Sequence, residues 1–225
     1  ALIWFFGGGW NHGGPDHSVA LARWARDLGL VGIAPDYRVK RRFGTPAIAA
    51  VADGRAALHW VEEHADELGI DPTRIVVGGN SAGGHLALWT AITQSPPGSS
   101  LAEAPGIKPA ALILTSAASD TTIPAALKYF GDDSRALSPI HQLDDRMPPV
   151  IAFHGAADPL VPPANAVALH ERLLATGNLS ELHLIPNGSH NYGGDLPEWK
   201  RRTLELSRDF LAHLNLLPTP TTPTR

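Results

Sequence analysis

Short apolar runs alternate with longer amphipathic segments along this chain of 225 residues. The apolar runs are nearly continuous, which is typical of strands buried on both faces of a parallel sheet. The segments between them carry apolar positions at helical spacing. We therefore predict an α/β fold with a mostly parallel sheet of about six strands flanked by helices. The predicted strands cover residues 2–6, 31–37, 74–78, 111–114, 150–153 and 181–185, and the predicted helices cover 17–28, 46–68, a segment starting at 82, 162–176 and 197–214.

Composition narrows the class of protein. The chain has 18 Lys and Arg against 22 Asp and Glu, and this acidic balance argues against a nucleic-acid-binding protein. No apolar run approaches the ~20 residues that a membrane-spanning helix needs, so we expect no membrane partner. The absence of cysteine excludes disulfides and a cysteine nucleophile. No H-E-x-x-H pattern occurs, so we expect neither a metal nor another cofactor.

The sharpest chemical signal is Gly79-Asn80-Ser81-Ala82-Gly83, which lies between a predicted strand and a predicted helix. A G-x-S-x-G motif in this setting indicates a nucleophile elbow, where a sharp turn exposes the serine hydroxyl above the sheet. A phosphate-binding loop would instead carry a lysine after its glycines, and none is present. We therefore predict that Ser81 is a nucleophile.

A serine hydroxyl needs a base to take its proton, and the chain offers eleven histidines. His190 combines a late loop, "PNGSHNYGG", with the chain order serine, acid, histidine that the elbow motif favours. We predict that His190 is the base. Seven of the other ten histidines are assigned to helix surfaces or packing (His59, His64, His85, His170, His213) or to lining the site (His12, His154).

The acid that orients the base should follow a strand between Ser81 and His190. Asp158, in "FHGAADPLVP", satisfies this order, and a carboxylate there would hold the imidazole tautomer. Asp120, in "LTSAASD", is the alternative, and either residue could instead be an ordinary turn or cap aspartate. We favour Asp158 because its loop is tighter and adjoins the strand before His190.

Acyl transfer also needs hydrogen-bond donors for a tetrahedral oxyanion. The sequence "FFGGGWNHGG" follows the first predicted strand, and its glycines leave backbone amides unscreened. We predict that the amides of Gly8, Gly9 and Ala82 form the oxyanion hole.

These motifs together resemble the α/β-hydrolase esterases, in particular bacterial acetyl-esterase, acetylxylan-esterase and feruloyl-esterase-like proteins. The family's H-G-G-G-W, D-Y-R, G-x-S-A-G-G-H and H-G-x-x-D motifs match residues 6–10, 36–38, 79–85 and 154–158, with Phe6 where a histidine is usual. The resemblance implies a sheet without a cap domain, with strands ordered 31–35, 2–6, 74–78, 111–114, 150–153 and 181–185. It also implies that strands preceding the glycine loop are missing and that Val31–Pro35 is an edge.

The resemblance favours hydrolysis of short acyl esters, with acetylated plant polysaccharide such as xylan as the expected substrate. Trp10, Tyr37 and Tyr192 are candidates for lining the rim and stacking on sugar rings, or for ordinary aromatic packing. No long helical insertion that could form a lid separates Ser81 from Asp158. The alternatives are a feruloyl esterase, a general carboxylesterase, an arylformamidase, a serine peptidase and a non-catalytic module of hydrolase fold.

The ends of the chain differ from its middle. We expect residues 1–215 to form the catalytic domain and the Pro/Thr-rich residues 216–225 to be a linker or tail. Such a linker suggests a neighbouring fused module and a secreted or periplasmic protein, because similar segments join carbohydrate-active modules.

Overall fold

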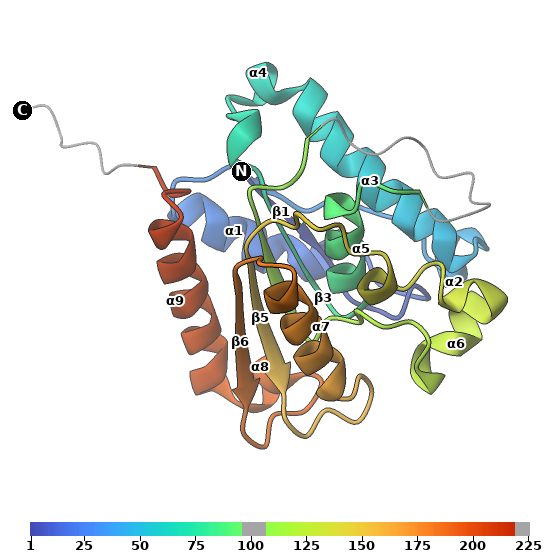
Figure 1. The fold of residues 1–225 in the computed structure, drawn as a ribbon. Coiled ribbons are helices and arrows are strands. Elements are labelled where there is room, and N and C mark those ends of the chain that lie inside the picture. Colours follow the sequence, from blue (N-terminus) through green and yellow to red (C-terminus); the bar gives the residue numbers. More distant parts are fainter. Residues whose placement is uncertain (96–106, 219–225) are drawn as a thin grey trace, which may run out of the picture.

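Six parallel strands form one sheet in the computed structural model of the protein, which describes residues 1–95 and 107–218 (Figure 1). The strands lie in the order β2-β1-β3-β4-β5-β6, which confirms the predicted α/β-hydrolase arrangement with β2 at one edge. Each neighbouring pair is parallel, so every connection crosses over the sheet. The strands are β1 (Leu2–Phe5), β2 (Gly32–Ile33), β3 (Val76–Asn80), β4 (Ala111–Thr115), β5 (Val150–Gly155) and β6 (Ser180–Ile185).

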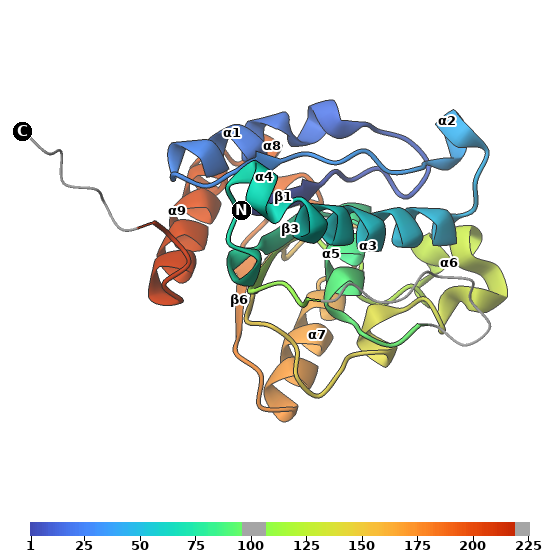
Figure 2. The ribbon, with the colours of Figure 1, turned by 90° about the horizontal axis from the view of Figure 1, so that it is seen from above.

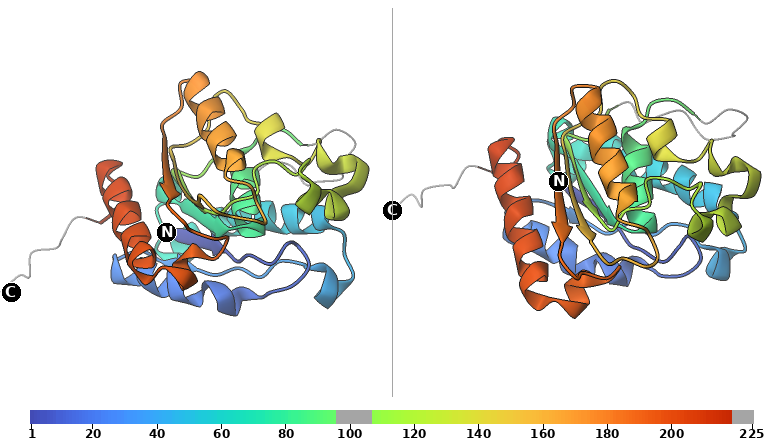
Figure 3. Two further views of the ribbon diagram at one scale, coloured as in Figure 1. Left: turned by 90° about the horizontal axis from the view of Figure 1, so that it is seen from below. Right: turned by 60° about the horizontal axis from the view of Figure 1, so that its bottom comes forward.

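Helices cover both faces of the sheet. One face carries α3, α5 and α7, and the other carries α1 and α9 (Figures 2 and 3). The helices are α1 (Val19–Asp27), α2 (Lys40–Phe43), α3 (Ala47–Glu63), α4 (Ala65–Leu68), α5 (Ala82–Ala91), α6 (Pro124–Phe130), α7 (Ala164–Ala175), α8 (Tyr192–Asp195) and α9 (Pro197–His213), with 3₁₀ turns at Pro15–Ser18, Pro72–Arg74, Gly131–Ser134 and Pro139–His141.

The strands bury side chains on both faces, as their continuous apolar runs predict. In β1, Ile3 and Phe5 join the core under α3 and α5, while Leu2 and Trp4 join the core under α1 and α9. This alternation follows from the two-residue period of a strand. The sheet is therefore the middle layer of three.

Several predicted boundaries differ from the structure. The second strand is only Gly32–Ile33, and the long helix predicted over 46–68 is interrupted at His64. The first residues of the predicted tail pack on the domain: Leu216 is buried in the core under α1 and α9, and Arg74 donates to the carbonyl oxygens of Asn215 and Leu217. Residues 219–225 of the predicted tail lie outside the described residues.

The carboxyl ends of the strands carry the loops in which the sequence places its chemistry. These loops follow β1, β3, β5 and β6. Because the strands are parallel, the loops begin at the same end of the sheet (Figure 3). In the part of the chain that the structure describes, we find no helix with the length and apolar character needed to span a bilayer.

Candidate active site

Ser81 occupies the sharp turn between β3 and α5. Its φ of 53° and ψ of −115° are a strained backbone conformation for a residue with a side chain. The Ser81 amide donates to the Thr115 carbonyl oxygen at 2.9 Å, and the Ser81 carbonyl oxygen accepts from the His85 amide at 3.1 Å. Gly83 permits the turn, because a Cβ there would lie 2.2 Å from the carbonyl oxygen of Phe5. Packing on both sides therefore fixes the serine at the end of β3.

The structure brings the side chains of Ser81, His190 and Asp158 into one hydrogen-bonded chain. His190 Nε2 lies 3.0 Å from Ser81 Oγ, and His190 Nδ1 lies 2.7 Å from Asp158 Oδ2. An ionised carboxylate can only accept, so Nδ1 carries the hydrogen and the Nε2 lone pair faces the serine hydroxyl. This is the arrangement in which a histidine can deprotonate a serine.

Asp158 is buried and fully supplied with hydrogen-bond donors. Its Oδ1 accepts from the amides of Leu160 at 2.8 Å and Val161 at 3.0 Å, while Oδ2 faces His190 and His154. Burial alone raises the pKa of Asp158, but hydrogen bonds from His154, His190 and Val161 outweigh it and hold the pKa well below its usual range. The carboxylate is therefore ionised wherever the protein is folded near neutral pH.

His154 also contacts the carboxylate of Asp158, and the sequence did not predict this contact. Its Nε2 lies 2.8 Å from the Val161 carbonyl oxygen and 3.1 Å from Asp158 Oδ2, and the residue is 1% exposed. A carbonyl oxygen can only accept, so Nε2 carries a hydrogen that it shares between the two oxygens. The four-residue spacing of the H-G-x-x-D motif was the signal that could have indicated this contact.

Asp120, the alternative acid, serves its own turn. Its Oδ1 accepts from the Thr122 amide at 2.8 Å, the Thr122 hydroxyl at 2.6 Å and the Ser138 hydroxyl at 3.2 Å. Within the described residues Asp120 forms no hydrogen bond with His190. The geometry therefore favours Asp158 over Asp120 as the partner of the base.

The glycine loop after β1 presents unpaired amides beside the serine. Among residues 1–95 and 107–218, the amides of Gly8, Gly9 and Ala82 donate to no other backbone group. Gly8 has a φ of 139°, and a Cβ there would lie 2.0 Å from the His12 carbonyl oxygen, so only glycine fits. Gly8, Gly9 and Ser81 line the same cavity. These donors are available to an oxygen that gains negative charge near Ser81.

Trp10 anchors the glycine loop through a buried histidine. Its Nε1 donates to His85 Nδ1 at 3.3 Å, and His85 Nε2 donates to the Leu137 carbonyl oxygen at 2.8 Å. The imidazole can do both only when neutral. Burial lowers the pKa of His85 to about 4, which keeps it neutral. Phe130 packs edge-on against the indole at 4.7 Å between ring centroids.

The three aromatic candidates for the rim are buried, which favours the packing alternative over stacking on sugar rings. Trp10, Tyr37 and Tyr192 are 4%, 2% and 4% exposed, because their rings fill the apolar layers beneath the loops. The Tyr37 hydroxyl donates to the Phe6 carbonyl oxygen at 2.8 Å, and its ring stacks on Phe6 at 4.0 Å. An aromatic pair therefore supports the loop at the position where the H-G-G-G-W motif has its histidine. Tyr192 contacts the Thr203 hydroxyl at 3.4 Å.

A cavity of about 330 Å³, which we call the serine cavity, opens onto Ser81. Helix α6 contributes to its wall, so the segment between β4 and β5 shields part of a site that the sequence predicted to be uncovered. His12 lines it, as the sequence analysis suggested. In the described residues no group of three His, Asp or Glu side chains is arranged to hold a metal ion. The cavity is lined by Gly8, Gly9, Trp10, His12, Asn80, Ser81, Ala118, Ile123, Ala125, Ala126, Lys128, Tyr129, Leu160, Val161 and His190.

Comparisons with known proteins agree with this geometry. A family profile described as alpha/beta hydrolase fold matches residues 2–193. Esterase LipQ of Mycobacterium tuberculosis is 28% identical over 247 residues, which cover 93% of this chain and 54% of LipQ. Carboxylic ester hydrolase LipN of the same organism is 46% identical over 88 residues, or 38% of this chain and 23% of LipN. The chain thus spans at most about half the length of these curated relatives.

Solved structures are similar over nearly the whole chain. The propionate-bound esterase Est2 of Thermogutta terrifontis is 31% identical, with a TM-score of 0.84, over 98% of this chain and 85% of that one. The butyrate-bound form is 32% identical, with a TM-score of 0.85 and the same coverage. A third structure, of the same esterase phosphonylated by sarin, has a TM-score of 0.86.

Proposed function

This chain belongs to the alpha/beta hydrolase family, and on that premise we propose that it is a serine carboxylesterase acting on short acyl esters. One observation carries the proposal: the hydrogen-bonded chain Ser81–His190–Asp158 lies beside unpaired amides of the glycine loop and α5. Acyl transfer requires a nucleophile with its base, and hydrogen-bond donors that stabilise the oxyanion. The relatives named as esterases support the same reaction class.

In the first half of the proposed reaction, Ser81 Oγ attacks the ester carbonyl carbon while His190 Nε2 takes the hydroxyl proton. The carbonyl oxygen becomes negatively charged and accepts hydrogen bonds from the amides of Gly8, Gly9 and Ala82. The C–O bond to the alcohol then breaks, and the imidazolium returns its proton to the leaving oxygen. The acyl group remains on Ser81.

In the second half, His190 deprotonates a water molecule that attacks the acyl carbon. The same amides hold the second oxyanion, and collapse releases the carboxylic acid and restores the Ser81 hydroxyl. Asp158 remains an anion throughout and stabilises the imidazolium that forms in each half. The balanced reaction is ester plus water giving acid plus alcohol.

A short acyl group is supported by the size of the serine cavity and by relatives. About 330 Å³ lies near the lower end of ligand pockets, and two similar structures are of Est2 with propionate and with butyrate bound. We propose that acetyl to butyryl esters are preferred. Acetylated xylan remains our candidate polymer substrate on the strength of the motif resemblance alone, because the expected aromatic rim is buried.

The test is a panel of 4-nitrophenyl esters from acetate to octanoate, with acetylated xylan, feruloylated xylan and an aryl formamide. We expect kcat/KM to fall steeply beyond butyrate, and Ser81→Ala to lower kcat by about 10⁵-fold or more while the melting temperature is unchanged. A variant that retains activity within tenfold of wild type would remove Ser81 from the mechanism. A preference for octanoate would indicate a general carboxylesterase, and faster formamide cleavage would indicate an arylformamidase.

A further inference from the structure

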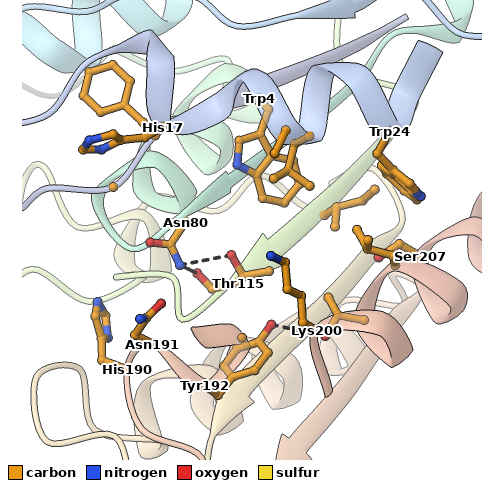
Figure 4. Close-up of a pocket in the computed structure, with 18 of the residues that line it drawn as sticks. Trp4, His17, Trp24, Asn80, Thr115, His190, Asn191, Tyr192, Lys200 and Ser207 are labelled. Atoms are coloured by element: carbon orange, nitrogen blue, oxygen red, sulfur yellow. Dashed lines mark hydrogen bonds between the residues drawn. The ribbon is translucent and has the colours of Figure 1, made fainter. Parts of the chain in front are cut away.

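A second and larger cavity, of about 680 Å³, lies between α1 and α9, and we call it the helix cavity (Figure 4). Its volume is within the ~300–1,000 Å³ typical of small-molecule sites. Four residues line both cavities: Gly8, His12, Asn80 and His190. Both cavities therefore adjoin the glycine loop and the candidate base.

The walls of the helix cavity are mostly apolar and partly aromatic. Trp4 and Ile113 come from the sheet, and Leu21 and Trp24 come from α1 (Figure 4). Leu204 of α9 contributes on the opposite side. Flat indole surfaces offer a planar ring more contact area than an aliphatic chain of the same length would gain.

The polar groups of the helix cavity favour an anion. Lys200 of α9 reaches toward the cavity, as Figure 4 shows. Its stem lies close to Gly193: a Cβ added to that glycine would be 3.9 Å from the Cβ of Lys200. Lys200 forms no ion pair within the described part of the chain. The lining includes His12, His17 and His190 but no aspartate or glutamate.

Ser207 adds an unused hydrogen-bonding group deeper along α9. The residue is 1% exposed, and its hydroxyl has no hydrogen-bond partner among the described residues although it lines the cavity. A buried hydroxyl without a partner costs free energy, which a bound oxygen acceptor would recover. Lys200 and Ser207 stand on the same helix, seven positions apart, and so lie along one face of it.

We propose that the helix cavity binds the alcohol part of the ester, and that this part is an aromatic ring bearing an anionic substituent. The inference rests on the proposed esterase function. His190 must protonate the leaving oxygen, so the alcohol lies against the His190 loop, and residues 190–193 of that loop line the helix cavity. The short acyl group stays in the serine cavity, which alone is lined by Ser81. The ring packs against the indoles of Trp4 and Trp24, and Lys200 pairs with its charge.

The first test compares two matched substrates that differ in one charge, 4-acetoxybenzoate and its neutral methyl ester. Each is hydrolysed by water to acetate and the corresponding phenol. We expect Lys200→Gln to lower kcat/KM for 4-acetoxybenzoate about tenfold and to change the neutral ester less than twofold. Lys128→Gln, which removes the lysine of the serine cavity, is the matched control and should leave the ratio of the two rates unchanged. An equal effect of Lys200→Gln on both substrates, or a larger effect of Lys128→Gln, would overturn the proposal.

The second test measures binding without catalysis. The product analogue 4-hydroxybenzoate is titrated into Ser81→Ala by calorimetry, alone and combined with Lys200→Gln or Ser207→Ala. We expect saturable binding that weakens about tenfold with Lys200→Gln, weakens severalfold with Ser207→Ala, and declines between 0.15 M and 1 M salt. Absence of binding to Ser81→Ala would reject the alcohol site even if wild type hydrolyses esters. Binding by a wild-type protein that hydrolyses no ester would retain the cavity as a ligand site and reject the esterase function instead.

Discussion

The acid loop (residues 154–161) and the glycine loop (residues 6–13) both flank Ser81. Hydrogen bonds are already formed in the acid loop, whereas donors are left unpaired in the glycine loop. In the acid loop, the charge of Asp158 is already present and four donors surround it. In the glycine loop, the amides of Gly8 and Gly9 have no backbone acceptor in the described residues. A permanent charge must be satisfied in the resting protein, whereas donors meant for a transient charge must be left free until it forms.

The two loops also differ in what holds them in place. The acid loop is held by polar contacts that converge on one carboxylate, with His154 as the buried outer donor. The glycine loop is held by aromatic packing: Phe6 on Tyr37, and Trp10 on His85 and Phe130. Aromatic anchoring supports a loop without competing for its amides, and this is consistent with the amides staying unpaired.

Among changes in these two loops, the largest effect is expected from neutralising the permanent charge of Asp158. Asp158→Asn should lower kcat about 10⁴-fold, because an amide cannot stabilise the imidazolium and would favour the wrong tautomer of His190. Steady-state kinetics on 4-nitrophenyl acetate measures this. Asp120→Asn is the matched control and should stay within about threefold of wild type, since its bonds serve a local turn. A greater loss in Asp120→Asn would transfer the acid role to the earlier loop.

The next effect is on the free energy of unfolding. The group that anchors the glycine loop and the group in the acid loop should lose their contributions at different pH values. Burial lowers the pKa of His85 to about 4, against about 6.5 in an unfolded chain, so only the unfolded chain binds this proton between those values. The contribution is complete above pH 6.5, and about 3 kcal/mol of unfolding free energy should be lost as the pH falls to 4. The pKa of Asp158 is lowered too, so its contribution is lost only below about pH 4.

Urea unfolding of wild type and His85→Gln at several pH values between 7 and 4 measures the two contributions. The variant should be less stable at pH 7, and its stability should decline less between pH 6.5 and 4. Parallel pH profiles for the two proteins would mean that His85 does not carry the mild-acid loss.

A smaller effect is expected from moving the free amides. Gly8→Ala places a Cβ 2.0 Å from the His12 carbonyl oxygen and should lower kcat about 10²-fold by displacing the oxyanion donors. Gly9→Ala is the matched control: the nearest atom to its Cβ would be the Tyr129 hydroxyl oxygen, at 3.4 Å, which is ordinary contact, so the main cost is a φ of 60°. If both variants lose activity equally, backbone strain rather than donor position controls the loop.

The smallest effect is expected from removing the hydrogen bond that His154 donates to Asp158. His154→Leu removes one of four donors to Asp158, which should lower kcat about tenfold and raise the pKa of Asp158 toward its usual range. His154→Gln keeps a donor and should recover part of the activity. The ¹³C chemical shift of the Asp158 carboxyl, followed through an acid titration, distinguishes a positioning role from general destabilisation. An unchanged titration in His154→Leu would reject that role.

The sequence by itself determined the features that are encoded locally. Short, nearly continuous apolar runs marked the strands, and the passage from strand to glycine turn to helix marked Ser81, because both patterns depend on fewer than about ten neighbouring residues. The strand order followed from the family resemblance and is confirmed by the structure. The catalytic roles of Ser81, His190 and Asp158 stay predictions, although the three side chains do form one hydrogen-bonded chain.

Only the tertiary structure decided which distant groups meet. Asp158 and Asp120 both follow strands, and the sequence favoured Asp158 only by its tighter loop and its motif. Which of them meets His190 depends on where β5 and β6 bring their loops together. The burial of Trp10, Tyr37 and Tyr192 depends on packing from other elements, which a pattern along the chain does not record. The helix cavity exists because α1 and α9, far apart in sequence, cover the same face of the sheet without filling the space between them.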